Sequence, residues 1–313
     1  MRSIAIIVTA AIAGVACSGD AQRGSAATKE PAGGATAFNG TAALAYAKAQ
    51  FDFGPRVPGT PAAKKAGDWI IAQMRSRADT VIVQSWTHTT ASGKKLPMRN
   101  ILARFRPELP ERVLYVTHWD SRPISEAAAS DADRKLPVPG ANDGASGVGL
   151  FIALGDVLKQ QKPTVGVDLL FVDGEDYGEF GPPEVDVLIG SAYFASHLPS
   201  PDYKPLFGVV WDMIGDSDLR IPYEAHSFQR APEVVARVWQ TAADLGYGSI
   251  FVQESGGPVT DDHIPLLNAG LRVIDVIDLT YDAHHTQMDT MDKVSARSLA
   301  IVGDVATALV TRP

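Results

Sequence analysis

The chain alternates between short, almost wholly apolar runs and longer stretches in which apolar residues return every three or four positions. The main apolar runs are VLYVTH (113–118), VDLLFVD (167–173), LFGVVWD (206–212) and residues 271–278. An unbroken apolar run of this length is typical of a strand that is covered on both faces of a sheet. We therefore expect these four segments to form the buried centre of a sheet.

The stretches with helical spacing fall between the apolar runs. They cover residues 62–77, 145–160, 232–245 and 295–309, with shorter helices expected at 191–197 and, capped by Thr41, at 41–50. The segments TVIVQSW and RNILARF predict two further strands. Strands that alternate with helices predict an α/β fold with a central mixed, mostly parallel, twisted sheet and helices on both faces. No linker-like break divides the chain after residue 37, so we expect one folded domain over residues 38–313.

The apolar runs end on residues that can bind a metal or carry a proton. In chain order these residues are His118, Glu175 with Asp176, Asp212, and His284 with His285. Ligands of open α/β sheets gather at the carboxyl ends of the strands. Several loops are therefore expected to bring imidazole and carboxylate groups to one edge of the sheet. Such groups are the donors expected of a metal-dependent hydrolase site.

Four acidic residues in these loops have features that suggest a role, and for three of them a simpler explanation is also open. Asp143 lies in the turn GANDGASG, where its carboxylate could bind a metal or merely cap the next helix. The adjacent acids Glu175 and Asp176 repel each other unless a cation compensates, which favours one as ligand and one as general base over a solvated acidic loop. Asp120, two residues after His118, could orient the imidazole ring.

Other carboxylates in the same loops are harder to place. Asp212 closes a buried strand and needs a partner there, either a metal or loop amides. Asp261 and Asp262 precede a short helical segment; we expect one to cap it and the other to face the site, and we choose Asp262 for the site. Asp289 and Asp292, which follow the two histidines, are interpreted as turn and cap residues.

Composition narrows the choice of partners. The chain has 313 residues and a net charge of −8, and 45% of its residues are hydrophobic. An acidic protein is a poor match for nucleic acid, whose phosphates need a basic surface. The single cysteine, Cys17, excludes an intramolecular disulfide.

The first 37 residues predict export. Arg2 precedes an apolar run over residues 4–15, which is shorter than the roughly 20 residues that span a bilayer and is typical of a signal peptide. The sequence Gly14-Val15-Ala16-Cys17 resembles a bacterial lipobox, although Gly14 departs from its usual residue. This likeness implies a lipid on Cys17 that anchors the protein to a membrane, facing the periplasm or the exterior; the alternative is ordinary cleavage near Ala16. Residues 18–37 are small, polar and rich in Pro and Gly, which predicts a flexible linker.

The ordered motifs HWD, GANDGASG, DGED, WDMIGD, DDHIP and HHTQMDT together resemble the M28 family of zinc exopeptidases. Within that family they are most similar to the glutaminyl cyclases of animal type and their bacterial relatives. The resemblance runs from FGPRVPGTP to the C-terminus and implies a zinc-exopeptidase-like catalytic domain over residues 38–313. It implies Zn2+ bound by Asp143, Asp176 and His285, with Glu175 as the residue that transfers protons.

The resemblance also distinguishes two kinds of site. His118 and Asp212 match the ligands of a second metal in two-metal aminopeptidases. In the cyclases these positions bind no metal, and the aspartate joins a hydrogen-bond network with the residue that matches Asp262. Two departures stand out: Asp176 replaces the usual glutamate and is one methylene shorter, and His284 replaces a tryptophan that walls the pocket of animal cyclases.

We therefore expect an enzyme that acts on peptide or protein N-termini. The resemblance favours a glutaminyl-peptide cyclotransferase, which converts N-terminal glutamine to pyroglutamate and releases ammonia with one zinc ion. An aminopeptidase with two zinc ions is the main alternative, and a metal-free binding protein on the same fold is a more remote one. The sequence indicates neither the side-chain preference nor the oligomeric state.

Overall fold

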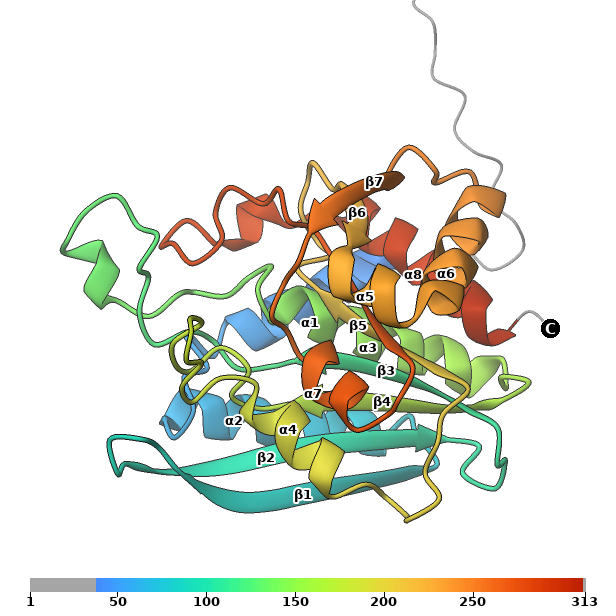
Figure 1. Ribbon diagram of the computed structural model, residues 1–313, viewed down its shortest axis with the longest axis horizontal. Helices are drawn as coiled ribbons and strands as arrows, with labels where there is room; N and C mark the ends of the chain where they lie inside the picture. Colours follow the sequence, from blue (N-terminus) through green and yellow to red (C-terminus); the bar gives the residue numbers. More distant parts are fainter. Residues whose placement is uncertain (1–37, 312–313) are drawn as a thin grey trace, which may run out of the picture. The chain divides into compact units, whose positions relative to one another are not determined.

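The computed structural model describes residues 38–311, and a six-stranded sheet with the order β1-β2-β4-β3-β5-β8 runs through them (Figure 1). The strands are β1 (Thr80–Thr89), β2 (Lys95–Phe105), β3 (Arg112–His118), β4 (Gly166–Val172), β5 (Phe207–Asp212) and β8 (Val273–Ile277). Strands β4, β3, β5 and β8 are parallel, whereas β1 and β2 add an antiparallel hairpin at one edge. The predicted mixed, mostly parallel α/β sheet is confirmed.

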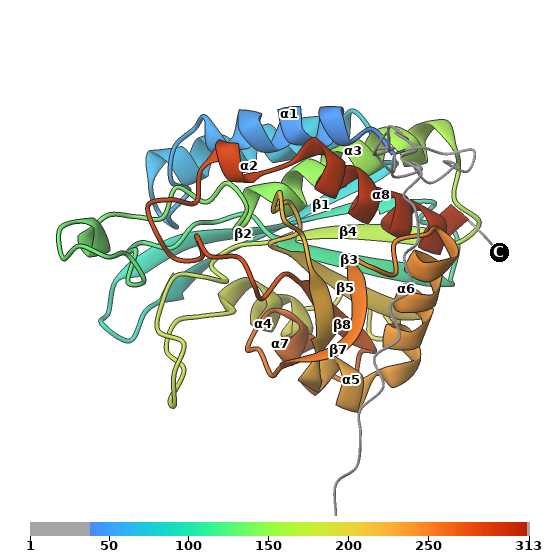
Figure 2. The same cartoon turned by 90° about the horizontal axis from the view of Figure 1, so that it is seen from above.

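Helices cover both faces of this sheet, as Figure 2 shows. The α-helices are α1 (Gly40–Phe51), α2 (Pro61–Arg75), α3 (Ala145–Gln160), α4 (Ile189–Ser196), α5 (Ala225–Arg230), α6 (Pro232–Asp244), α7 (His263–Asn268) and α8 (Ala296–Thr311). Helices α1, α2, α3 and α8 lie on one face, and α4 and α7 lie on the other. Two short 3-10 helices, η1 (Asp133–Lys135) and η2 (Met291–Lys293), lie in loops.

The alternation of side chains along the central strands explains why both faces are apolar. Tyr115, Phe171 and Trp211 point into the larger core on the α3 side, whereas Leu114 and Leu170 point into the smaller core under α4 and α7. Each fully buried side chain of this size contributes about 1.5–3 kcal/mol relative to an exposed one. Burial on both faces therefore holds the strand ends at fixed positions.

The structure departs from the sequence prediction in two local respects. Helix α1 begins at Gly40 and is capped by Asn39, whose side-chain oxygen accepts a hydrogen bond from the Ala42 amide at 2.9 Å, so Thr41 is not the cap. A second, two-stranded parallel sheet of β6 (Ile221–Glu224) and β7 (Phe251–Gly257) was not predicted, because β6 is short and β7 is largely exposed.

The predicted signal peptide (1–17), with Cys17, and the predicted linker (18–37) lie outside the described residues. Within residues 38–311, no helix combines the length and the apolar character needed to cross a bilayer.

Candidate metal centre

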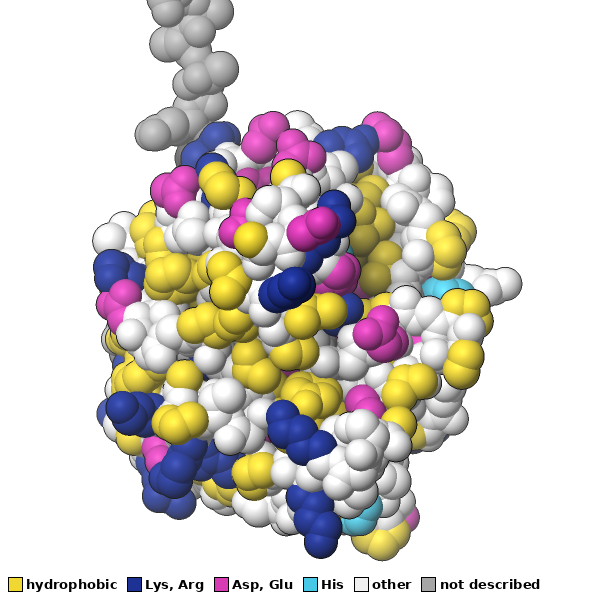
Figure 3. Space-filling view, turned by 90° about the vertical axis from the view of Figure 1, so that its left-hand side faces the viewer, with side chains coloured by type: hydrophobic (Ala, Val, Ile, Leu, Met, Phe, Trp, Pro, Cys, Tyr) yellow, Lys and Arg dark blue, Asp and Glu magenta, His cyan; other side chains and the backbone are white. Residues whose placement is uncertain are grey.

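The predicted ligands meet at the carboxyl ends of the parallel strands. His118 ends β3 and pairs with Val172, the last residue of β4, while Asp212 ends β5 and pairs with Ile277, the last residue of β8. Because these strands end at the same level, the segments that follow them surround one cavity of about 730 Å³. Figure 3 looks onto this side of the molecule, where a hollow opens among hydrophobic and acidic side chains.

One group of donors is centred on His118, which is buried. Its Nε2 lies 3.0 Å from Asp143 Oδ1 and 3.1 Å from Asp212 Oδ1. Burial lowers the pKa of His118, but Asp212, Asp120 and Asp143 outweigh this effect and hold the pKa well above its usual value. These carboxylates thus favour a positive charge at this point, and a divalent cation can supply it.

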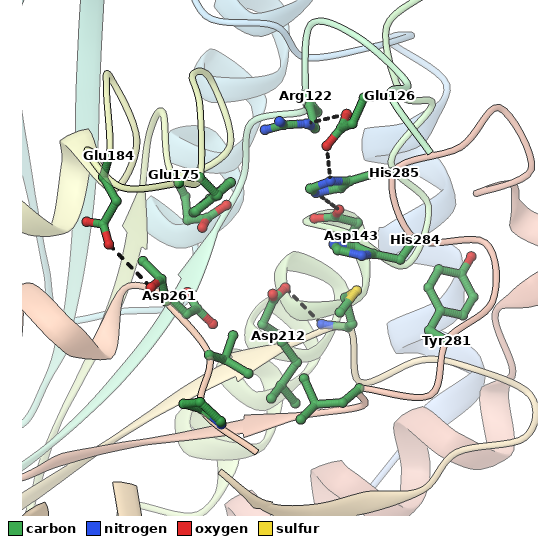
Figure 4. A pocket seen from close by; sticks show the side chains of 18 of the residues that line it. Arg122, Glu126, Asp143, Glu175, Glu184, Asp212, Asp261, Tyr281, His284 and His285 are labelled. Carbon is green, nitrogen blue, oxygen red and sulfur yellow. Dashed lines mark hydrogen bonds and ion pairs between the residues drawn. The ribbon is translucent and has the colours of Figure 1, made fainter. Parts of the chain in front are cut away.

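A second group of donors is centred on His285, on the other side of Asp143. Its Nε2 lies 3.7 Å from Asp143 Oδ2 (Figure 4). The same nitrogen lies 3.3 Å from Asp176 Oδ1. Its Nδ1 is 2.6 Å from Glu126 Oε1, and this hydrogen bond turns Nε2 toward the two aspartates. Burial lowers the pKa of His285, yet Asp176 and Glu126 raise it to about 10. Asp143 thus presents one carboxylate oxygen to each histidine.

The turn that carries Asp143 approaches His118 so closely that it requires a glycine. Gly144 has φ +91°, and a Cβ at this position would lie 2.7 Å from the Asp120 carbonyl oxygen and 3.2 Å from His118 Cε1. A side chain here would be strained by both the backbone conformation and the contact.

Asp176 has a cationic neighbour that the sequence did not reveal. Arg122 Nη1 lies 2.8 Å from Asp176 Oδ1, while the other oxygen of Asp176 is buried without a hydrogen-bond partner. Arg122 also binds Glu126, with 2.7 Å between Nε and Oε2. Both residues belong to the long loop after β3, where no periodic pattern marks them. Through them this loop holds Asp176 and His285 in place.

His284 lies beside the second group of donors. Its ring centroid is 3.7 Å from that of His285, and it lines the cavity as the sequence predicts for a wall residue. Potential ligand atoms of Asp143, His284 and His285 all lie within 4.8 Å of one another, as do those of His118, Asp143 and Asp212. Asp176 belongs to neither set, although its Oδ1 contacts both His285 and Arg122.

Glu175 faces the cavity and is buried among other acids. Burial, reinforced by the charges of Asp176 and Asp261, raises its pKa well above the usual range, although His118 acts in the opposite direction. The backbone amides of Glu175 and Asp176 donate hydrogen bonds to Asp120 at 3.1 and 3.3 Å. Asp120 Oδ1 also lies 3.6 Å from His118 Nδ1, on the side of the ring from which it was expected to orient the imidazole.

The structure reverses our choice between the two aspartates before α7. Asp261 lines the cavity, whereas Asp262 is fully buried and does not line it. Burial and the charge of Asp212 raise the pKa of Asp261 to about 6. The expected cap is also absent: Asp262 directly precedes α7, and its side chain makes no capping hydrogen bond. Adjacent aspartates look alike in a sequence, and only the path of the backbone shows which one reaches the cavity.

A buried polar layer lies behind Asp261. His263 Nε2 lies 3.2 Å from Glu224 Oε2, and its Nδ1 lies 3.9 Å from Asp275 Oδ2. Sequence reasoning missed Glu224 and Asp275, because a single acid inside or beside a short strand has no distinguishing pattern.

Two imidazoles and several carboxylates that converge at a buried, carboxylate-rich site fit a zinc ion, which binds nitrogen and oxygen donors in this way. The strand order and these donors are those of a metal-dependent α/β protein. The chain belongs to peptidase family M28, whose model matches residues 100–310.

Comparison with individual proteins agrees with this family. The crystal structure of Porphyromonas gingivalis glutaminyl cyclase superimposes with a TM-score of 0.84 and 38% identity, over 88% of this chain and 98% of that one. A leucine aminopeptidase precursor from Bacteroides thetaiotaomicron gives a TM-score of 0.86 and 32% identity, over 90% and 99%. A probable zinc metalloprotease from Leptosphaeria maculans is 33% identical over 53% of this chain, and the match spans only 39% of that relative.

Proposed function

We propose that this protein is a zinc-dependent glutaminyl-peptide cyclotransferase, which acts on peptides that begin with glutamine. The observation that carries the proposal is the position of Asp261, whose carboxylate lines the cavity beside Glu175 and Asp212.

The residues of the cavity can carry out this reaction. Asp143, Asp176 and His285 would hold the zinc ion, which when bound supplies a Lewis acid for the side-chain amide carbonyl. Glu175 accepts a proton from the α-amine as the amine nitrogen attacks the amide carbon. It then returns this proton to the departing amide nitrogen, so that one C–N bond forms, one breaks, and ammonia leaves. A carboxyl group with a raised pKa suits both steps.

Asp261 and Asp212 act on Glu175 rather than on the substrate. Asp261 raises the pKa of Glu175, and its own pKa is raised by burial and by Asp212. The raised pKa makes the Glu175 carboxylate a stronger acceptor for the proton of the α-amine.

The contact of His118 with both Asp143 and Asp212 favours a second candidate function. These three residues provide a complete second donor group. With ions in both groups, Glu175 would deprotonate a water molecule, and hydrolysis would release the N-terminal residue. In this case the protein would be a two-zinc aminopeptidase.

A paired assay distinguishes the two reactions. Purified protein is incubated with a glutaminyl peptide and, separately, with a leucyl peptide, and the products are identified by mass spectrometry. We expect the glutaminyl peptide to lose ammonia and the leucyl peptide to remain intact. Release of the N-terminal residue without ammonia loss would overturn the cyclase proposal. Elemental analysis of the same sample should find one zinc ion per chain for the cyclase and two for the aminopeptidase.

We also propose that the protein is exported and carries a lipid on Cys17, on the strength of the signal-like segment and lipobox. Mass spectrometry of the mature N-terminus tests this proposal, and an unmodified N-terminus created by cleavage at another residue would contradict it.

A further inference from the structure

Asp289 is a fully buried carboxylate that joins the two segments carrying Asp143 and His285. Its Oδ1 accepts hydrogen bonds from the Asn142 amide at 2.8 Å and the Tyr281 hydroxyl at 2.6 Å. Its Oδ2 accepts one from the Asp143 amide at 3.2 Å. Burying a carboxylate costs free energy unless donors surround it, and here three donors converge on one side chain.

The turn that Asp289 holds is also fastened to the segment after β5. Asn142 Oδ1 accepts a hydrogen bond from the Gly215 amide at 2.8 Å, and Asn142 Nδ2 donates one to the Met213 carbonyl at 3.3 Å. Asn142, whose backbone amide binds Asp289, therefore links the segment after Asp212 to the turn that carries Asp143.

Arg56 supports the same turn from its other end. The side chain is fully buried and donates hydrogen bonds at 2.6 Å to the carbonyl oxygens of Pro139 and Gly140. With the backbone held at residues 139–140 and again at 142–143, the Asp143 side chain has little freedom to move relative to His285.

We propose that Asp289 is a positioning residue of the metal centre. By binding the Asp143 amide from a point four residues after His285, it sets the separation between a carboxylate and an imidazole that would hold the same ion. The inference requires a zinc centre at Asp143 and His285, but it is independent of whether the enzyme cyclises or hydrolyses its substrate. It replaces the sequence-based interpretation of Asp289 as a turn residue.

Asp289→Asn tests this role with little change in volume. The amide oxygen can take the place of Oδ1 and keep two donors, but its NH2 group then faces the Asp143 N–H, so this hydrogen bond is lost. Asp292→Asn is the matched control. It removes the same charge from the same loop, but its side chain is 67% exposed and pairs with Lys293.

The measurements are zinc affinity, by competition with a chromophoric chelator, and the melting temperature with and without zinc. We expect Asp289→Asn to bind zinc about 10- to 100-fold more weakly, as for partners of metal ligands elsewhere, and to gain less in melting temperature from zinc. Asp292→Asn should match the wild type in both measurements. If Asp289→Asn binds zinc as tightly as the wild type, the proposal is overturned and Asp289 is a purely structural residue. This conclusion holds whatever the melting temperature of the metal-free variant.

Should Asp289→Asn fail to fold, Asp289→Glu takes its place. It keeps the charge and both acceptor oxygens but displaces them by one methylene, so we again expect weaker zinc binding, and wild-type affinity would again overturn the proposal. If the wild-type protein itself binds no zinc, the proposed metal centre fails, and this result is distinct from a failure of Asp289 alone.

Discussion

Glu175 shows how much of the chemistry depends on the immediate surroundings of one side chain. An isolated glutamate is ionised at neutral pH. Here burial and the neighbouring acids raise the pKa of Glu175, while the backbone of its turn is held by Asp120. The surroundings thus provide a carboxyl group that can both accept and return a proton.

We expect Glu175→Gln to reduce turnover by about 10²- to 10⁴-fold, because the amide cannot carry the proton between the two nitrogens. Zinc content and melting temperature should stay near wild-type values, since the substitution keeps the size of the side chain. Steady-state kinetics and elemental analysis measure both effects.

Glu179→Gln provides the comparison, because it removes a carboxylate from the same loop, where it is more exposed. It should lower turnover far less. Turnover in Glu175→Gln close to that of the wild type would show that Glu175 does not transfer the proton.

At the scale of elements, the central strands were predictable from the sequence, whereas the buried polar layer behind Asp261 was not. The strands β3, β4 and β5 are buried at every position, so their sequences are almost wholly apolar. Strand β6 has only four residues and α5 only six, so neither is long enough to show a period. Their position depends on Glu224, which accepts hydrogen bonds from the backbone amides of His226, Ser227 and Val259.

Glu224→Gln should destabilise this part of the fold in a pH-dependent way. Burial would raise the pKa of Glu224, but His263 and the backbone amides of α5 outweigh it and lower the pKa to about 2. Because the folded-state value lies below the usual 4.5, the carboxylate contributes stability above pH 4.5, and this contribution is lost as the pH falls through about 2.

Urea denaturation of both proteins over a range of pH tests this expectation. At pH 7 the variant should lose about 1.5–3 kcal/mol in the free energy of unfolding, the usual contribution of hydrogen bonds to a charged group. The difference between the two proteins should shrink steadily below pH 4.5. A difference that does not change with pH would mean that the charge of Glu224 is not its source.

At the scale of the whole molecule, the metal centre connects loops that are far apart in the sequence. His118, Asp143, Asp176, Asp212 and His285 come from different segments. An ion that binds several of them stabilises the folded chain, because the unfolded chain does not bring them together.

Removing zinc with a chelator should therefore lower the melting temperature, and adding zinc back should restore it. At a free zinc concentration of 1,000 times Kd, the ion contributes about 4 kcal/mol to the free energy of unfolding. Differential scanning calorimetry measures the difference in melting temperature with and without zinc. In His285→Ala, which removes one ligand, zinc should change the melting temperature much less than in the wild type. Identical melting temperatures with and without zinc in the wild-type protein would contradict a metal centre that joins these loops.

The sequence by itself determined the alternation of strands and helices, and with it the edge of the sheet where His118, Glu175 and Asp212 gather. Local patterns suffice for this, because burial on both faces of a strand imposes a continuous apolar run. The tertiary structure decided which of Asp261 and Asp262 reaches the cavity, and that Arg122, Glu126 and Asp289 hold the ligands. Those contacts join residues far apart in the chain, and their geometry depends on backbone paths that no local pattern records.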